Sequence, residues 1–207
     1  MGRPRAGASS TEGQGMTVRI QCRCGTVQGE IEPSGVYARL TCYCRDCQAW
    51  ARWLGGPGLV DDRGGSDVLA VVPARMRFTR GLEQLRCATF SGRVLRWYAA
   101  CCRSPLANTA ADPKVQYAGV LATAVVSPAE VQALAGPPGR VVANHKSATG
   151  PVRATPLALA GAVVQVGSRI IGGRLRGVRR SPFFDDAGQP LRVPERISPP
   201  PAAEAVR

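Results

Sequence analysis

Short segments in which apolar and polar residues alternate fill the first part of the chain. Val18, Ile20 and Cys22 alternate with polar residues, as in a strand with one buried face. Similar runs, bounded by turns rich in glycine and proline, predict further strands at 26–31, 36–40, 68–72, 76–78 and 93–98. We therefore predict a mainly β domain over residues 16–126.

The pattern changes to helical spacing after this domain. Ser127-Pro128-Ala129-Glu130 is a capping box with proline at the first helical position, and Gly136 follows, which predicts a short helix over 128–135. A longer helical pattern covers 157–178. It places apolar residues on one face and mainly basic residues on another: Val164, Ile171, Leu175 and Val178 against Gln165, Arg169, Arg176 and Arg180.

Two arrangements fit this longer helix. It packs its apolar face on the β domain and exposes its arginines, or it lies on nucleic acid or on an anionic membrane surface. Gln165, Ser168 and Arg169 interrupt the apolar stretch before it reaches the ~20 residues of a membrane span. We therefore predict no transmembrane segment.

The chain divides further by composition. Residues 1–15 contain Gly, Ser, Arg and Pro with little to bury, which predicts a disordered tail. Residues 127–189 are predicted to be a helical basic extension packed on the β domain. Residues 190–207 read as a Pro-rich tail, and together with Pro182 they predict an extended segment that docks through Phe183 and Phe184.

The charge of the chain favours acidic partners. Lys and Arg number 27 and Asp and Glu 14, so the formal net charge is +13. Such a balance suits nucleic acid, anionic lipid or a carboxylate substrate. Aromatic residues do not alternate with the arginines, which argues against a surface that stacks single-stranded bases.

Seven of the eight cysteines fall into three clusters, 22/24, 42/44/47 and 101/102, and Cys87 is predicted to be an ordinary buried residue. Three cysteines within six residues are poor disulfide partners and good ligands for one zinc ion. No apolar signal segment begins the chain, so we predict a reducing, cytoplasmic setting. The simplest allocation assigns Cys22, Cys24, Cys101 and Cys102 to a closed structural site. It leaves Cys42, Cys44 and Cys47 on a second zinc with an open position.

An open zinc site can bind a thiol or a water. His145, the only histidine, lies far along the chain and is not expected to complete the site. Arg45 suits the carboxylates of a small thiol such as glutathione, and Tyr43 and Asp46 are further candidates for proton transfer or anchoring. Trp50 and Trp53 follow the triplet in a short helix or loop. They either form a wall of a substrate pocket or belong to the core.

These motifs resemble those of the glutathione-dependent formaldehyde-activating enzymes, the family that includes centromere protein V. The match runs over about 17–120 through Cys22-x-Cys24-Gly25, Cys42-x-Cys44-x-x-Cys47 and Cys102-x-Ser104-Pro105-Leu106. The resemblance implies stacked β-sheets and a structural zinc on the first and last cysteine groups. It also implies a second zinc that receives the glutathione thiol in a carbon–sulfur lyase reaction.

The chain departs from that family at three motif positions and in its length. Ala99 stands where the family has a first cysteine, Arg103 where it has glycine, and Tyr43 where it often has histidine. Cys101 would have to replace the missing ligand. Together with the basic extension, these departures suggest an uncharacterised bacterial branch, and function need not transfer between branches.

Two classes of function fit these features of the sequence. One is an enzyme that acts on a small thiol adduct at the three-cysteine zinc. The other is a zinc-stabilised binding module whose basic helix meets nucleic acid, a membrane surface or a protein. A purely structural zinc protein and a thiol redox sensor are further alternatives. Thiol binding at the triplet would favour the enzyme, and steeply salt-dependent DNA binding would favour the module.

Overall fold

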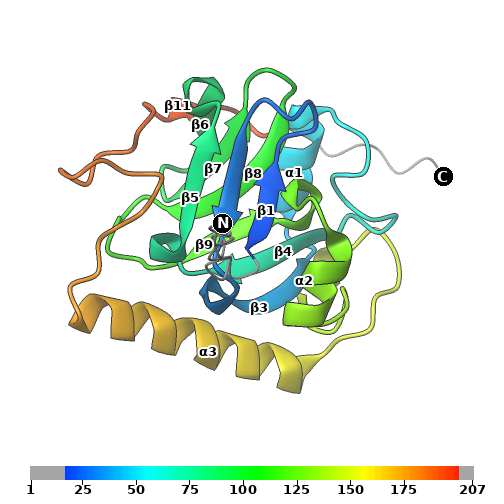
Figure 1. The fold of residues 1–207 in the computed structure, drawn as a ribbon. Coiled ribbons are helices and arrows are strands. Elements are labelled where there is room, and N and C mark those ends of the chain that lie inside the picture. Colours follow the sequence, from blue (N-terminus) through cyan, green and yellow to red (C-terminus); the bar gives the residue numbers. More distant parts are fainter. Residues whose placement is uncertain (1–16, 201–207) are drawn as a thin grey trace, which may run out of the picture.

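The structure, a computed structural model, describes residues 17–200. It contains two β-sheets and three α-helices, which confirms a mainly β fold (Figure 1). The predicted disordered tail at 1–15 and the last seven residues of the predicted Pro-rich tail lie outside the described residues.

A small sheet and a large sheet enclose the main core. The small sheet has the order β1-β2-β5 and is antiparallel, with β1 at Val18–Gln21, β2 at Gln28–Ile31 and β5 at Met76–Arg80. The large sheet has the order β10-β3-β4-β9-β8-β7-β6-β11. Its strands are β3 (Val36–Cys42), β4 (Ser66–Val71), β6 (Leu85–Thr89), β7 (Val94–Ala99), β8 (Ser104–Ala110), β9 (Ala118–Leu121), β10 (Val142–Ala143) and β11 (Glu195–Arg196).

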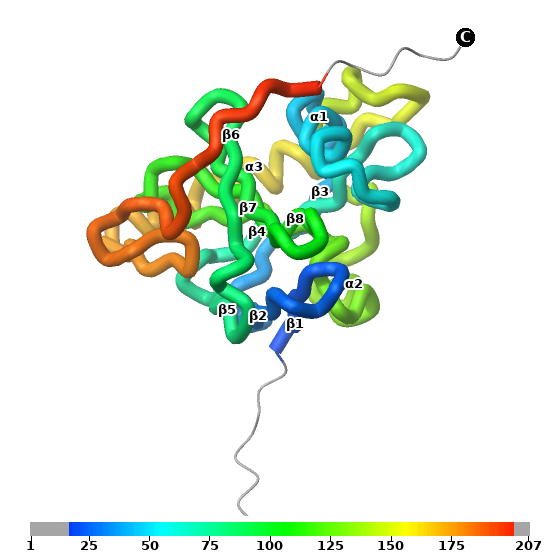
Figure 2. Tube along the Cα trace, turned by 90° about the horizontal axis from the view of Figure 1, so that it is seen from above, coloured from blue at the N-terminus to red at the C-terminus, as the bar shows by residue number. Residues whose placement is uncertain are grey.

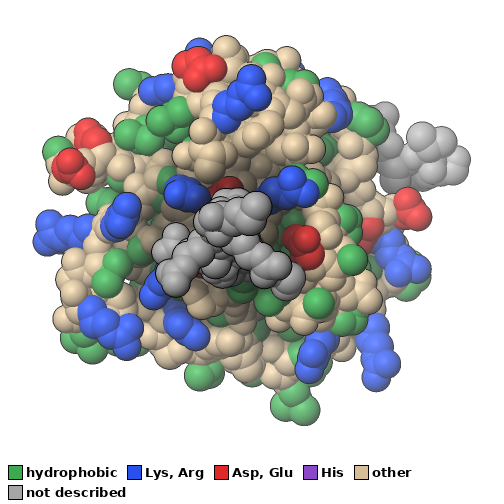
Figure 3. Space-filling model, in the orientation of Figure 1, with side chains coloured by type: hydrophobic (Ala, Val, Ile, Leu, Met, Phe, Trp, Pro, Cys, Tyr) green, Lys and Arg blue, Asp and Glu red, His purple; other side chains and the backbone are tan. Residues whose placement is uncertain are grey.

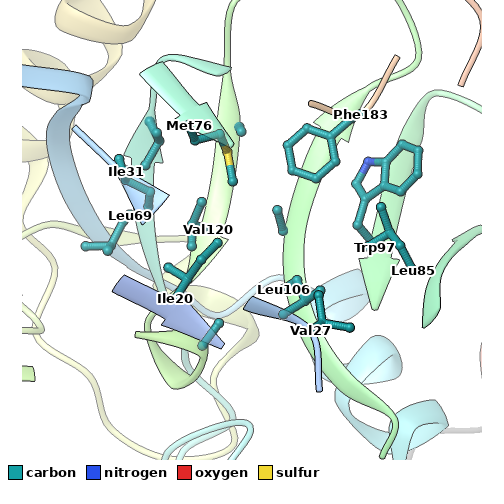
Figure 4. Packing of buried hydrophobic residues seen from close by; sticks show 14 of the residues in the cluster. Ile20, Val27, Ile31, Leu69, Met76, Leu85, Trp97, Leu106, Val120 and Phe183 are labelled. Carbon is teal, nitrogen blue, oxygen red and sulfur yellow. The ribbon is translucent and has the colours of Figure 1, made fainter. Parts of the chain in front are cut away.

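Alternation along each strand decides which side chains fill this core. In β1, Val18 and Ile20 are buried while Arg19 and Gln21 are exposed. Figure 4 shows side chains of both sheets converging on the same space, among them Ile20, Ile31, Leu69, Trp97, Leu106 and Val120. The predicted strands are therefore confirmed, and their burial supplies the main hydrophobic stabilisation.

Two of the helices begin at capping side chains. α1 (Arg45–Leu54) begins where the Cys44 side chain accepts a hydrogen bond from the Cys47 amide. The segment with Trp50 and Trp53, predicted to be either a short helix or a loop, is therefore a helix. α2 (Pro128–Ala135) matches its prediction, since Ser127 Oγ accepts from the Glu130 amide at 3.4 Å.

α3 (Pro156–Leu175) is the predicted longer helix, but its packing differs from the first of the two predicted arrangements. Val164, Ile171 and Leu175, expected to face the β domain, are 71%, 60% and 84% exposed. The helix lies against β3 and β10 through small residues instead, with Ala162 and Gly173 buried. A Cβ added at Gly173 would come within 2.8 Å of the Gln116 side chain, so only glycine permits this approach.

The chain beyond residue 126 takes part in the large sheet. β10 pairs in parallel with β3, and β11 pairs in parallel with β6. Phe183 and Phe184 are buried in the main core, as docking through them predicts. Figure 2 shows the last described segment, in red, running along β6 toward α1, where Ile197 joins a second cluster with Trp50 and Tyr98.

Candidate metal centres

Two groups of cysteine thiols each gather within 4.8 Å, and both match the predicted allocation. The four-cysteine group consists of Cys22, Cys24, Cys101 and Cys102, and the three-cysteine group of Cys42, Cys44 and Cys47. All eight cysteines are free of disulfides, and Cys87 is buried apart from both groups, as predicted.

The loops after β1 and β7 bring the four-cysteine group together. Cys22 and Cys24 come from the first loop, and Cys101 and Cys102 from the turn between β7 and β8. Cys101 Sγ lies 3.8 Å from Cys22 Sγ, 3.3 Å from Cys24 Sγ and 3.9 Å from Cys102 Sγ. Four thiolates in a tetrahedron around one zinc at ~2.3 Å stand roughly 3.8 Å apart, so these thiols fit one ion.

The first loop positions its two thiols through its backbone. The Gly25 amide donates to the Cys22 carbonyl at 2.9 Å, and the Val27 amide donates to Cys22 Sγ at 3.2 Å. Hydrogen bonds from the Thr26 hydroxyl and backbone lower the pKa of the Cys24 thiol to about 6. Amides and hydroxyls aimed at sulfur favour the thiolate, which is the form that binds metal.

The turn that carries Cys101 and Cys102 is tied to both the first loop and α1. The Arg23 guanidinium donates to the Cys102 carbonyl at 3.0 Å, and the Arg23 amide to Ser104 Oγ at 2.9 Å. Arg103 has a positive φ of 53°, at the position where the resembling family has glycine. Its guanidinium lies 4.4 Å from the Trp53 ring centre and donates to the Leu54 carbonyl at the end of α1. These contacts offset the strain of the left-handed backbone.

We expect Gly81→Ala to loosen this site. Gly81 has a φ of 73°, and a Cβ there would lie 2.2 Å from the Thr26 carbonyl oxygen, so alanine would push the loop that carries Cys22 and Cys24. The matched control Gly58→Ala has a φ of 69° and nothing within 4 Å of the added atom. Thermal unfolding should show a loss about 1–3 kcal/mol larger for Gly81→Ala than for the control, with weaker zinc retention. Equal losses would mean that the contact with Thr26 is unimportant.

The three-cysteine group lies where β3 passes into α1. Cys42 ends β3, Cys44 caps α1 and Cys47 is in the first turn of the helix. Hydrogen bonding with Cys44 and Cys47 lowers the pKa of Cys42, and the Cys42 and Cys44 sulfurs raise the pKa of Cys47. Three thiols this close cannot all ionise unless a cation balances them, which is the property of a metal site.

A residue of the C-terminal extension contacts this second group. Asn144 Nδ2 lies 3.5 Å from Cys42 Sγ, because the parallel pairing of β10 with β3 brings residues 142–144 beside the end of β3. Asn144 itself has a left-handed φ of 56°. The neighbouring His145 is not among the ligand atoms that gather within 4.8 Å. Asn144 was not among the predicted site residues, since no local motif signals a contact across 102 residues.

Tyr43 stabilises the surroundings of the triplet. Its hydroxyl donates a hydrogen bond to Asp61 Oδ2 at 2.8 Å. Burial is the larger cause, and this hydrogen bond the second, that raises the pKa of Tyr43 to about 12. Gln48 Nε2 donates to the carbonyls of Tyr43 at 2.9 Å and Ser147 at 2.7 Å. Asp61 thus joins its loop to Tyr43, and Gln48 fastens the extension to α1.

The two residues predicted to bind substrate differ in exposure. Arg45, the first residue of α1, is exposed beside Cys44. Trp50 is only 3% exposed, stacks on Trp53 at 5.1 Å and packs edge-on against Tyr98. This burial favours the second interpretation of the tryptophans, as core residues that hold α1 in place.

The fold and the two thiol groups define the chain as a mainly β protein with two cysteine groups that can hold metal ions. It belongs to a family of unknown function, DUF6151, whose pattern matches residues 15–192. A comparison with curated proteins finds no match. The crystal structure of a Rhodobacter sphaeroides protein, a Northeast Structural Genomics target, is similar at 20% identity and a TM-score of 0.40. The similarity covers 55% of this chain and 94% of that one. None of the three comparisons names the formaldehyde-activating family, so that resemblance stays a prediction.

Proposed function

We propose that this protein binds zinc at both cysteine groups and uses the three-cysteine zinc to hold the thiol of a small substrate. The observation that carries the proposal is the division of seven cysteines into four and three. Among residues 17–200, no fourth Cys, His, Asp or Glu joins the triplet. Structural zinc sites have four protein ligands, whereas catalytic sites keep one position open.

The substrate class follows from the resemblance to glutathione-dependent formaldehyde-activating enzymes and from the charge beside the triplet. The proposed activity is that of a carbon–sulfur lyase on a small thiol adduct, in a stacked-sheet fold of that family's type. Three motifs in the family's order, including the Ser104-Pro105-Leu106 run, support it. The exposed guanidinium of Arg45 is suited to pair with a carboxylate of the thiol. The positive end of α1 adds to that attraction.

The proposed reaction needs little from the protein beyond positioning. A thiol adds to formaldehyde by forming one carbon–sulfur bond, while the carbonyl π electrons move to oxygen and the thiol proton finally resides there. Zinc, when bound, would stabilise the thiolate form. Asn144 would orient Cys42 through the amide contact at 3.5 Å. Asp46, which is exposed next to Arg45, would exchange the proton with solvent.

Zinc content of the purified wild type and of Cys44→Ser tests the proposal. We expect two zinc ions per chain in the wild type and one in the variant, with the fold retained because the four-cysteine group is intact. Cobalt(II) substituted at the triplet should change its absorption spectrum on addition of glutathione in the wild type. Cys87→Ala, which alters a cysteine outside both groups, should keep both ions and the spectral response.

Each alternative result has a definite meaning. One zinc in the wild type that Cys44→Ser leaves in place would show that the triplet is empty, and the proposal would fail. Two zinc ions with no response to glutathione and no acceleration of its reaction with formaldehyde would overturn the substrate assignment. One zinc lost together with the fold would make the triplet a structural site.

A further inference from the structure

A long segment of the C-terminal extension carries only positive charge. From Val131 to Phe184 the chain has no Asp or Glu, but it has Lys146 and seven arginines. Arg153 precedes α3, and Arg176, Arg179 and Arg180 follow it; all four are exposed. Within residues 17–200, no ion pair engages these four side chains. Cations therefore stand at both ends of the helix.

Between these cations, the outer face of α3 is apolar. Leu157 is 88% exposed and Val163 62%, and Val164, Ile171 and Leu175 are exposed as described above. In Figure 3, hydrophobic and basic side chains but no acidic ones are visible along the lower edge, where α3 lies in Figure 1. Exposed apolar surface of this extent on one helix marks a surface that a partner covers.

The helix is fixed along the surface of the domain. At its start, the Val142 amide donates to Thr155 Oγ1 at 2.8 Å. Near its end, Arg174 pairs with Asp112 at 2.9 Å, and Gly173 packs on Gln116. By length and composition α3 can cross a membrane. While these attachments hold, however, it lies flat with its inner face on β3 and β10.

We propose that the outer face of α3 docks on an anionic lipid bilayer, with its apolar side chains in the interface and its flanking arginines on the headgroups. The apolar side chains match the acyl boundary of such a surface, and the flanking cations match its anionic headgroups. Nucleic acid would leave the apolar row uncovered. A second copy bound through this face would bring the flanking arginines of one chain against those of the other.

Vesicle binding by the purified full chain tests this proposal. We expect it to sediment with vesicles of phosphatidylcholine mixed with phosphatidylglycerol, to bind pure phosphatidylcholine vesicles much more weakly, and to dissociate as salt is raised. Val164→Glu should weaken binding by about tenfold or more, because burying an apolar side chain accounts for at least that factor. Val193→Glu is the matched control, since it adds the same carboxylate at a valine 92% exposed outside the helix.

The control should bind within about twofold of the wild type. Equal binding by Val164→Glu and Val193→Glu, or no preference for the anionic vesicles, would overturn the proposal. So would a dimer in solution that Val164→Glu separates while the wild type ignores vesicles. Vesicle binding through α3 does not involve the metal sites. Cys44→Ser should therefore bind vesicles like the wild type, whether or not the triplet holds zinc.

Discussion

Cys101→Ser is expected to unfold the protein or to leave it only marginally folded. Cys101 is exposed at a turn, where a substitution ordinarily changes the free energy of unfolding by at most about 0.5 kcal/mol. As the thiol closest to Cys24 and near the other two, however, it is central to the four-cysteine group. Structural zinc contributes about 10–16 kcal/mol of apparent binding energy, as much as the whole stability of a typical domain. Circular dichroism and zinc content of the purified variant measure the effect.

Two comparisons separate loss of metal from loss of packing. A chelator should unfold the wild type and have no further effect on Cys101→Ser. Arg103→Lys, which alters the next residue in the same turn but no thiol, should keep its zinc and lose far less stability than Cys101→Ser. A folded Cys101→Ser with an unchanged melting temperature would mean that the four thiols do not hold a stabilising ion.

Much of the β domain could be predicted because its signals are local. Alternation with period two identified β1 to β5 and β7, although not β6, β8 or β9, and the capping box at Ser127 located α2 almost to the residue. The cysteine groups could be assigned because three clusters of cysteines have few ways to satisfy a tetrahedral ion. Spacing alone was sufficient for this step.

The parts that could not be predicted depend on long-range contacts. Two-residue strands such as β10 and β11 have no periodicity to detect. The contact of Asn144 with Cys42, which depends on the pairing of β10, could therefore not be predicted from the sequence. The packing of α3 was predicted from the apolar residues on one face. Small residues on the opposite face permit closer approach to β3, and that contact decides the orientation.

Phe183→Ala is expected to destabilise the protein by about 3–5 kcal/mol. Phe183 is fully buried, and its ring lies 5.5 Å from Phe78 of the small sheet and 5.1 Å from Trp97 of the large sheet. It therefore fills the space between the two sheets, as Figure 4 shows. At about 2–4 °C per kcal/mol for a chain of this size, the melting temperature should fall by roughly 6–20 °C.

A graded series identifies the cause of that loss. Phe183→Leu keeps much of the side-chain volume and should lose distinctly less than Phe183→Ala, whereas Val193→Ala, in the exposed tail, should change the melting temperature very little. A loss below about 1 kcal/mol for Phe183→Ala would mean that the C-terminal extension is not packed into the core. A loss of the expected size would make this phenylalanine part of the hydrophobic core, since a surface-docked appendage would not stabilise the space between the sheets. The β domain would then depend on residues beyond 126 for its stability, and a chain ending there would not be an independent folding unit.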